Sequence, residues 1–365
     1  MADGADELLV VVVTSEGVKR SVVVRLHSTI SENVTYDCID IYKQPGLEHP
    51  LLKTHKIQMK SSISRNELKM QTGKNETSNK RKIVCPNGTV PILRNTKEYV
   101  TNSQVFAEKH FHPLSADSPG THINPGLYGD QRVWAFGFWK GKDGKGCYNT
   151  ACSGFVQVSK VIPIVEPIDL KPGVPGWFRY FIHQDINTGN WWITQLMQKS
   201  PDVDIGYWPK ELFNLLENGA NMVGVGGVVQ ASRSGSSPPM GNGNFPNGGR
   251  LDSGLFSNID VLNSNYEQRK INSFPVENLL DSEKCYGLRI GTVKPFHRNH
   301  LGFFFNYGGP GGNSCGKDTE GSSTKGVEEE SEKERRVDGE EDVAKRDEVA
   351  EKGERERQSC TSEGT

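Results

Sequence analysis

Residues 176–196 read GWFRYFIHQDINTGNWWITQL and decide the fold class. Two runs rich in aromatic and β-branched residues flank the polar stretch INTGN. A short turn containing Asn and Gly between two such runs indicates an antiparallel hairpin, in which alternate side chains face opposite sides of the sheet. This segment therefore predicts two paired strands, with Trp191 and Trp192 on opposite faces.

Runs of the same texture recur on both sides of this hairpin. They are RVWAFGFWK (132–140), GFVQVSKVIPIV (154–165), DIGYWP (204–209), NMVGVGGVV (221–229), GLFSNIDVLN (254–263), CYGLRIG (285–291) and LGFFFNYGG (301–309). Only KELFNLLENGA (210–220) offers a helical turn or two. Short strands at near-regular spacing predict an all-β protein with an antiparallel β-sandwich. Near the start, LLVVVV (8–13) and SVVVRL (21–26) predict a separate hairpin.

Charge is distributed unevenly along the 365 residues, although the formal net charge is only -2. Residues 317–365 hold 17 acidic and 10 basic side chains, and such a segment cannot bury enough apolar surface to fold, so we expect a disordered tail. The rest lacks a basic stripe, which argues against nucleic-acid binding. No apolar run is long enough to span a membrane. The run LLVVVV follows acidic residues rather than basic ones, so it is not recognised as an export signal.

The stretch NMVGVGGVVQ (221–230) raises the question of a phosphate loop. Counting from Gly224 places Val229 where the dinucleotide-binding pattern needs its last glycine. The following residues are rich in Ser, Pro and Gly, which is typical of a loop rather than of the helix that the motif requires. The sequence predicts no organic cofactor.

The cysteines and histidines do not form a metal site in sequence. Cys147 and Cys152 lack a CxxC pattern and nearby histidines, so a small disulfide-closed loop is the better interpretation. The pairs His110/His112 and His297/His300 lack further ligands, and we interpret them as surface residues. Three N-glycosylation sequences, at Asn33, Asn75 and Asn87, suit an extracellular protein.

Several motifs together carry a family likeness. YDCIDIYKQPGLEHPLLKTHKIQM (36–59) and CPNGTVPILR (85–94) resemble the activation peptide of the plant neprosin family. Downstream motifs of that family follow in order, and they are LYGD (127–130), GCYNTACSGFVQ (146–157), GNWW (189–192), GYWP (206–209), GNFP (243–246), LFSNIDVLN (255–263), CYGL (285–288) and FFFNYGGPGGNSC (303–315). The resemblance implies an activation-peptide-like region over residues 1–100 and a catalytic-type domain over 101–316, before the tail at 317–365.

The resemblance also implies a function. Neprosins are glutamic endopeptidases that cleave next to proline, and they are secreted as proenzymes that need no metal or organic cofactor. Such chemistry uses two carboxyl groups at one cleft, one ionised as the base and one protonated as the acid. The expected partners are therefore proline-containing peptides, and the expected location is extracellular.

Neither family glutamate is present in this chain. Reading back from LYGD places Ser118 at the first glutamate position, with Asp117 one residue away. After the glycines of VGGVV, Val228 occupies the second position. Serine and valine cannot hold the required proton, so we expect weak or absent peptidase activity. The segment before LYGD is also short for the family, which predicts a sandwich lacking some strands.

Aromatic residues and cysteines provide further candidates, and the first two disulfide pairs below are what the resemblance implies. Trp191, Trp192, Tyr207 and Trp208 are candidates either for a substrate cleft or for plain core packing. Disulfides are expected between Cys147 and Cys152 and between Cys285 and Cys315. Cys38 and Cys85 form a further candidate pair, whereas Cys360 is expected to be a free thiol. Two alternatives to a peptidase stay open: a module that binds peptide or cell-wall polymer without cutting it, and a degenerate product without function. The sequence holds no information on oligomeric state.

Overall fold

A computed structural model of the chain describes residues 6–14, 22–24, 34–63, 83–109, 117–168, 178–197, 200–214, 216–232, 235–247, 253–291, 302–313 and Cys315. Residues 6–14, 22–24 and 117–119 are described by their backbone pairing alone. The predicted disordered tail, Cys360, the sequences at Asn33 and Asn75 and both histidine pairs lie outside the described residues.

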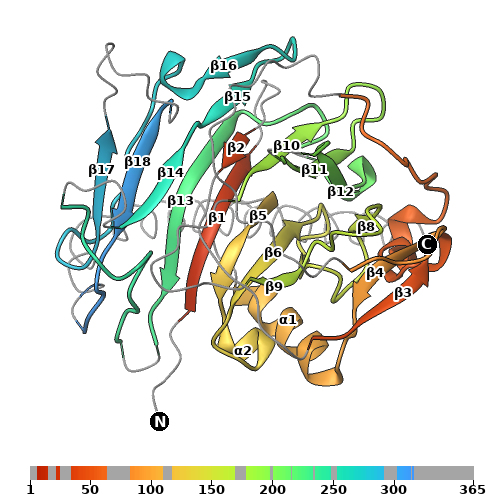
Figure 1. Ribbon diagram of the computed structural model, residues 1–365, viewed down its shortest axis with the longest axis horizontal. Helices are drawn as coiled ribbons and strands as arrows, with labels where there is room; N and C mark the ends of the chain where they lie inside the picture. The colour runs from red at the N-terminus through yellow and green to blue at the C-terminus, as the bar shows by residue number, and fades with distance from the viewer. Residues whose placement is uncertain are drawn as a thin grey trace, which may run out of the picture. The chain divides into compact units, whose positions relative to one another are not determined.

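Sheet A contains the strand that carries the glycines of the stretch NMVGVGGVVQ. Its order is β13 (Met222–Gln230), β1 (Asp6–Thr14), β5 (Asp117–Ile123), β6 (Val133–Lys140) and β7 (Gly146–Tyr148), and β9 (Glu166–Ile168) also pairs with β6. Every pairing is antiparallel. Figure 1 shows β1 between β13 and β5.

Sheet B is built around the predicted hairpin. Its order is β16 (Gln268–Lys270), β15 (Asp260–Leu262), β2 (Val22–Val24), β10 (Tyr180–Gln184), β11 (Trp191–Gln195), β12 (Val203–Trp208) and β8 (Val156–Gln157). Strands β10 and β11 pair antiparallel across residues 185–190, so the hairpin prediction is confirmed. Gly189 in its turn has φ +77°, a conformation that favours glycine.

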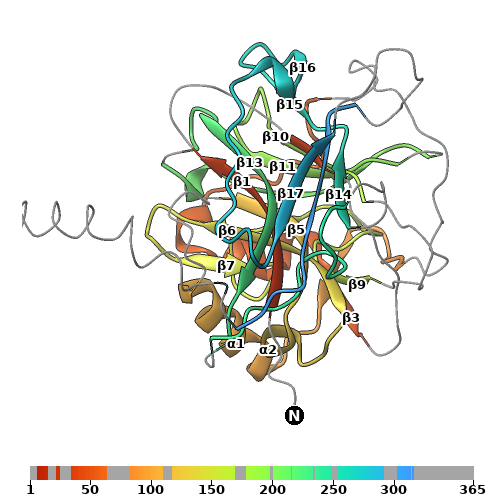
Figure 2. The same cartoon turned by 90° about the vertical axis from the view of Figure 1, so that its left-hand side faces the viewer.

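The remaining elements are short. Sheet C has the order β14 (Gly254–Ser257), β18 (Phe304–Gly308), β17 (Gly287–Gly291), and β3 (Tyr36–Asp40) pairs with β4 (Thr89–Leu93). The helices are α1 (Lys97–Lys109) and α2 (Pro125–Tyr128), which contact each other (Figure 2). Single 3₁₀ turns are η1 (Ile41–Lys43), η2 (Pro45–Glu48), η3 (Pro50–Leu52), η4 (Lys210–Leu212) and η5 (Ile271–Ser273). The protein is mostly β with antiparallel sheets, as predicted.

Sheets A and B pack face to face around one apolar core. A Cβ built on Gly137 of β6 would lie 3.0 Å from the ring of Trp208 in β12, so glycine permits this close approach. Trp191, Trp208 and Phe138 are buried in the same cluster. Aromatic side chains of this size dominate core energetics because each buries a large apolar surface.

The amino-terminal hairpin prediction is wrong. Strand β1 pairs with β13 and β5 in sheet A, whereas β2 pairs with β10 and β15 in sheet B. The two β-branched runs thus complete two different sheets instead of pairing with each other. The first residues of the chain thus supply one strand to each of the two large sheets.

The expectation of a single helical segment at 210–220 is also corrected. The longest helix in the described part of the chain is α1, and residues 210–212 form only a 3₁₀ turn. In α1, Tyr99, Ser103 and Ala107 are buried at intervals of four, the spacing of one helical face. Few of its residues are strongly apolar, and this is why the sequence pattern was weak.

Candidate functional site

Ser118 and Val228, which the resemblance places at the two family glutamate positions, do not meet in this fold. Val228 of β13 pairs with Leu8 of β1, and Leu8 pairs in turn with His122 of β5. Ser118 lies four residues from His122 along β5 and pairs with Phe138. With about 3.3 Å per residue along a strand and about 4.8 Å between strands, the Cα atoms of Ser118 and Val228 are roughly 16 Å apart. Strand β1 therefore separates the two positions.

The sheet surface beside His122 is packed rather than open. The His122 ring stacks on Phe136 with centroids 4.2 Å apart, and its Nε2 lies 2.8 Å from the Tyr128 hydroxyl. Asn149 donates its side-chain N–H groups to the hydroxyls of Tyr128 and, from helix α1, Tyr99. All five side chains are mostly or fully buried, and none carries a carboxyl group.

The four aromatic candidates divide into two pairs. Trp191 and Trp208 belong to the main core, where the Trp191 indole donates to the carbonyl of Leu216. They do not line a cleft, because their faces of β11 and β12 pack between the sheets. Trp192 and Tyr207 lie on the opposite face with Val156. The alternation predicted for Trp191 and Trp192 is confirmed.

Trp192 and Tyr207 are covered by a segment of the same chain. Leu47 and Ile57, from residues 34–63, pack on the apolar cluster that these two rings form with Val156. Both rings are consequently buried. Residues 55–62, His-Lys-Ile-Gln-Met-Lys-Ser-Ser, make most of the polar contacts there and are called the docking segment below. The docking face comprises the residues that receive it, namely His183, Asp185, Thr188, Asn190, Trp192, Asp204, Tyr207 and Glu211.

Gln58 is the centre of this contact. Its Oε1 accepts hydrogen bonds from Thr188 Oγ1 at 2.7 Å, Asn190 Nδ2 at 2.9 Å and Trp192 Nε1 at 3.0 Å. Its Nε2 donates to Asp185 Oδ2 at 3.0 Å, and its backbone N–H donates to the Tyr207 hydroxyl at 2.9 Å. The side chain of Gln58 thus binds the turn and strand β11 of the hairpin, and its backbone N–H binds the neighbouring strand β12.

Asp185 is the main acceptor on the docking face. It accepts from the backbone N–H and the hydroxyl of Ser62, and also from the backbone N–H groups of Asn187 and Thr188 within its own turn. Burial disfavours the charged carboxylate, but these hydrogen bonds and that from Gln58 together lower the pKa of Asp185 below its ordinary value. The residue is therefore a carboxylate at neutral pH.

The ends of the docking segment are held by two further contacts. His55 lies 3.2 Å from Glu211 Oε1 through Nδ1 and 2.9 Å from the Tyr207 hydroxyl through Nε2. The hydrogen bond from His55 is the largest cause that lowers the pKa of Glu211. At the other end, the backbone N–H of Ser61 donates to Asp204 Oδ2 at 3.0 Å.

A serine and a histidine meet on this face without forming a hydrolytic triad. Ser61 Oγ lies 2.6 Å from His183 Nε2. Burial lowers the pKa of His183 to about 3, and within the described residues its Nδ1 has no hydrogen-bond partner. A triad needs a base that is oriented through that second nitrogen. We therefore interpret the pair as a structural contact.

One acid elsewhere has an unusual pKa. Glu166 of β9 is partly buried beside β6, and burial raises its pKa to about 7. Such a carboxyl could serve as a general acid. It pairs with Ala135 on β6, away from β13, so it does not form an acid pair with the Val228 position.

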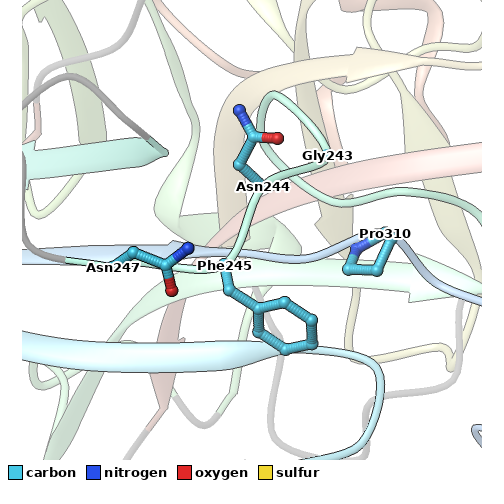
Figure 3. Close-up of a pocket in the computed structure, with 5 residues that line it drawn as sticks. All are labelled: Gly243, Asn244, Phe245, Asn247 and Pro310. Carbon is cyan, nitrogen blue, oxygen red and sulfur yellow. The ribbon is translucent and has the colours of Figure 1, made fainter.

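A shallow pocket lies on the loop that precedes sheet C (Figure 3). It encloses about 490 Å³ and is lined by Gly243, Asn244, Phe245, Asn247 and Pro310. It includes neither of the family glutamate positions and none of the four aromatic candidates. Within the described residues no group of His, Cys, Asp or Glu is arranged to hold a metal ion, and no helix there has the length and apolar character for crossing a bilayer.

Three disulfides join the cysteines that were paired from the sequence. The structure links Cys147 to Cys152 and Cys285 to Cys315, with Cα atoms 6.1 and 5.6 Å apart. It also links Cys38 to Cys85 across 47 residues, with Cα atoms 5.5 Å apart. Asn87 is exposed, and its side-chain oxygen accepts a hydrogen bond from Lys160. Glycosylation at this position stays a prediction.

These features define a disulfide-bonded β-sandwich with a segment from its amino-terminal part docked on one sheet. Comparison with family models identifies two regions of the chain. A model described as Neprosin matches residues 97–310, and one described as Neprosin activation peptide matches residues 31–123. The chain belongs to the neprosin family. The docking segment falls inside the activation-peptide match.

Sequence reasoning missed the residues that build the docking face. Gln58 gives no local signal because a single glutamine in a polar stretch is unremarkable. Asp185 does have one: an aspartate that opens a tight turn is expected to accept backbone N–H groups two and three residues on. That pattern finds the turn, but it does not show that Gln58, 127 residues earlier, also binds there.

Proposed function

We propose that this protein is a neprosin-type sandwich, directed by descent at proline-containing peptides, with little or no endopeptidase activity. The observation that supports this proposal is the fate of the two glutamate positions. Ser118 and Val228 carry no carboxyl group, and strand β1 lies between their strands. The two-carboxyl mechanism needs an acid and a base at the same peptide bond.

Peptidase assays on the secreted full chain test this proposal. A proline-containing peptide is incubated at pH 3–7 with the wild-type chain and with the Ser118→Ala/Val228→Ala double variant. We expect no cleavage above background in either. Robust turnover by the wild-type chain would show that other residues provide the acid and the base.

Peptide binding without cleavage is the second candidate function. It is supported by the docking face, where two aromatic rings and several polar groups already bind an extended segment of the same chain. Isothermal titration with a proline-rich peptide tests it, and binding should weaken in Trp192→Ala. The activation-peptide boundary near residue 100 and an extracellular location are part of the same proposal, and the three disulfides support the latter.

A further inference from the structure

The docking face recognises the amide of Gln58 from both sides. Its oxygen accepts three hydrogen bonds and its nitrogen donates one to the Asp185 carboxylate. A glutamate at this position would place a second carboxylate against Asp185, and a methionine would leave the three donors without an acceptor. Sites that hydrogen-bond both ends of a polar group reject isosteric analogues strongly, because their own polar groups are then left unpaired.

The receiving groups are held by the body of the protein itself. Asp185 is fixed by the backbone N–H groups of Asn187 and Thr188. Asn190 accepts the backbone N–H of Lys210 at 3.1 Å, which orients its amide toward Gln58. The Trp192 and Tyr207 rings pack with centroids 4.7 Å apart. A face that is organised without its ligand binds with a smaller entropic cost.

Hydrogen bonding and spacing define the ligand. On the docking face Asp185, Asp204 and Glu211 bind Gln58, Ser61 and His55 of the segment, whereas Lys56 and Lys60 are exposed. Ile57 and Gln58 face the sheet, the next two side chains are exposed, and Ser61 and Ser62 turn back to the acids. The recognised pattern is Ile-Gln, two variable residues and Ser-Ser.

We propose that the docking face is a peptide-binding site specific for extended peptides with an Ile-Gln-x-x-Ser-Ser pattern, for which residues 55–62 act as an intramolecular ligand. This inference rests on the second candidate function and specifies its ligand. The site lies on sheet B, so it is independent of the Ser118 and Val228 positions on sheet A.

The first experiment weakens the binding of the docking segment to the docking face in the full-length protein. Gln58→Ala removes the amide, and the rate of tryptic cleavage after Lys56 and Lys60 then measures how readily the docking segment detaches. We expect cleavage there to be at least about tenfold faster than in the wild-type chain, because a hydrogen-bonded anchor between partly buried groups has been lost. Near-UV circular dichroism checks that the sandwich is still folded. Unchanged protection would show that Gln58 is not an anchor and would overturn the proposal.

The second experiment adds a labelled peptide of residues 55–63, HKIQMKSSI, to the Gln58→Ala protein. We expect saturable binding by fluorescence anisotropy, weakened at least about tenfold when alanine or glutamate replaces the glutamine of the peptide. Asp185→Asn in the same background should weaken binding as well, whereas the exposed matched control Glu277→Gln should not.

The outcomes separate this inference from the function on which it rests. Binding of a proline-rich peptide but not of HKIQMKSSI would overturn the inference and leave peptide binding intact. If neither peptide binds to the vacated face, both are wrong. Equal affinity for the glutamine, alanine and glutamate peptides would show a general acidic surface and would also overturn the inference.

Discussion

At position 228 the chain presents an exposed valine on the strand where the family resemblance expects a catalytic carboxyl group. The backbone glycines around it persist, since Gly226 has open space beside it and Gly227 packs against Met240 and Tyr307. The glycines of VGGVV are therefore present without the carboxyl group that the resemblance predicts after them. Position 118, a serine, carries no carboxyl group either.

Restoring both glutamates tests whether residue identity alone limits activity. We expect Ser118→Glu/Val228→Glu to show no peptidase activity at acidic pH, because roughly 16 Å and one strand separate the two positions. Cleavage of a proline-containing peptide is the measurement, and Ser118→Gln/Val228→Gln is the uncharged control. Turnover that appears only in the glutamate variant would contradict the register of β1.

Glu166 provides a pH-dependent prediction at the same scale. Burial raises its pKa from 4.5 to about 7, so the folded protein binds this proton more tightly than the unfolded chain. Its contribution is complete below about pH 4.5 and is lost as the pH rises through about 7. In the wild-type chain the free energy of unfolding should fall by about 3 kcal/mol across this pH range, and Glu166→Gln should abolish this decrease.

Urea unfolding at a series of pH values measures this effect. The exposed Glu277→Gln serves as the control and should follow the wild-type chain. An identical pH slope in the wild-type and Glu166→Gln proteins would show that the carboxyl group is not desolvated.

At the scale of elements, strands β1 and β2 complete the two sheets. Strand β1 supplies the partner for both β13 and β5, and β2 bridges β10 and β15. Deletion of residues 1–26 should therefore leave unpaired edges in both sheets and abolish cooperative unfolding. Thermal unfolding followed by near-UV circular dichroism is the measurement. A sharp transition in the truncated chain would restore the idea that these strands lie outside the sandwich.

One glycine in η2 permits close contact between the activation-peptide region and the sandwich. A Cβ on Gly46 would lie within bonding distance of the backbone carbonyl of Phe155, and Gly154 donates its N–H to the Gly46 carbonyl at 2.9 Å. Gly46→Ala should destabilise this contact by about 1–3 kcal/mol and thereby speed tryptic cleavage after Lys56. Gly226→Ala is the matched control, because nothing lies near the added methyl group. Equal protection of the two variants would count against a close contact here.

The local sequence pattern predicted where the strands lie better than it predicted which strands pair with each other. The hairpin of β10 and β11 was readable because its strands and its turn are neighbours in sequence. Strand β1 was readable as a strand, but its partner β13 is more than two hundred residues away and no local pattern specifies that pairing. The run 254–263 shows the same limit, since it divides into β14 of sheet C and β15 of sheet B. For the site, the aromatic residues were found, whereas Gln58 depends wholly on tertiary contact.

At the scale of the whole molecule, the disulfide from Cys38 to Cys85 closes a loop within the activation-peptide region, and this loop contains the docking segment. Strand β3 carries Cys38, and Cys85 precedes β4. A single cut between these cysteines should leave two chains joined by the bond. We expect the trypsin-cut protein to run as one band on a non-reducing gel and as two after reduction.

The variant Cys38→Ser/Cys85→Ser supplies the control. After the same cut, its two fragments should separate on a denaturing gel without reductant. Separation of the wild-type fragments under non-reducing conditions would show that Cys38 and Cys85 are not bonded to each other in the mature protein.

The pairing of the first strand with β13 also has a kinetic consequence. Thr14 pairs with Met222 and Asp6 with Gln230, so the ribosome must add more than two hundred residues before β1 can meet this partner. At a synthesis rate of about 5–20 residues per second, β1 stays without this partner strand for on the order of ten seconds or more. Contacts between such distant residues also slow folding. The protein should therefore depend on chaperones during synthesis more than its stable β-sheets alone would suggest.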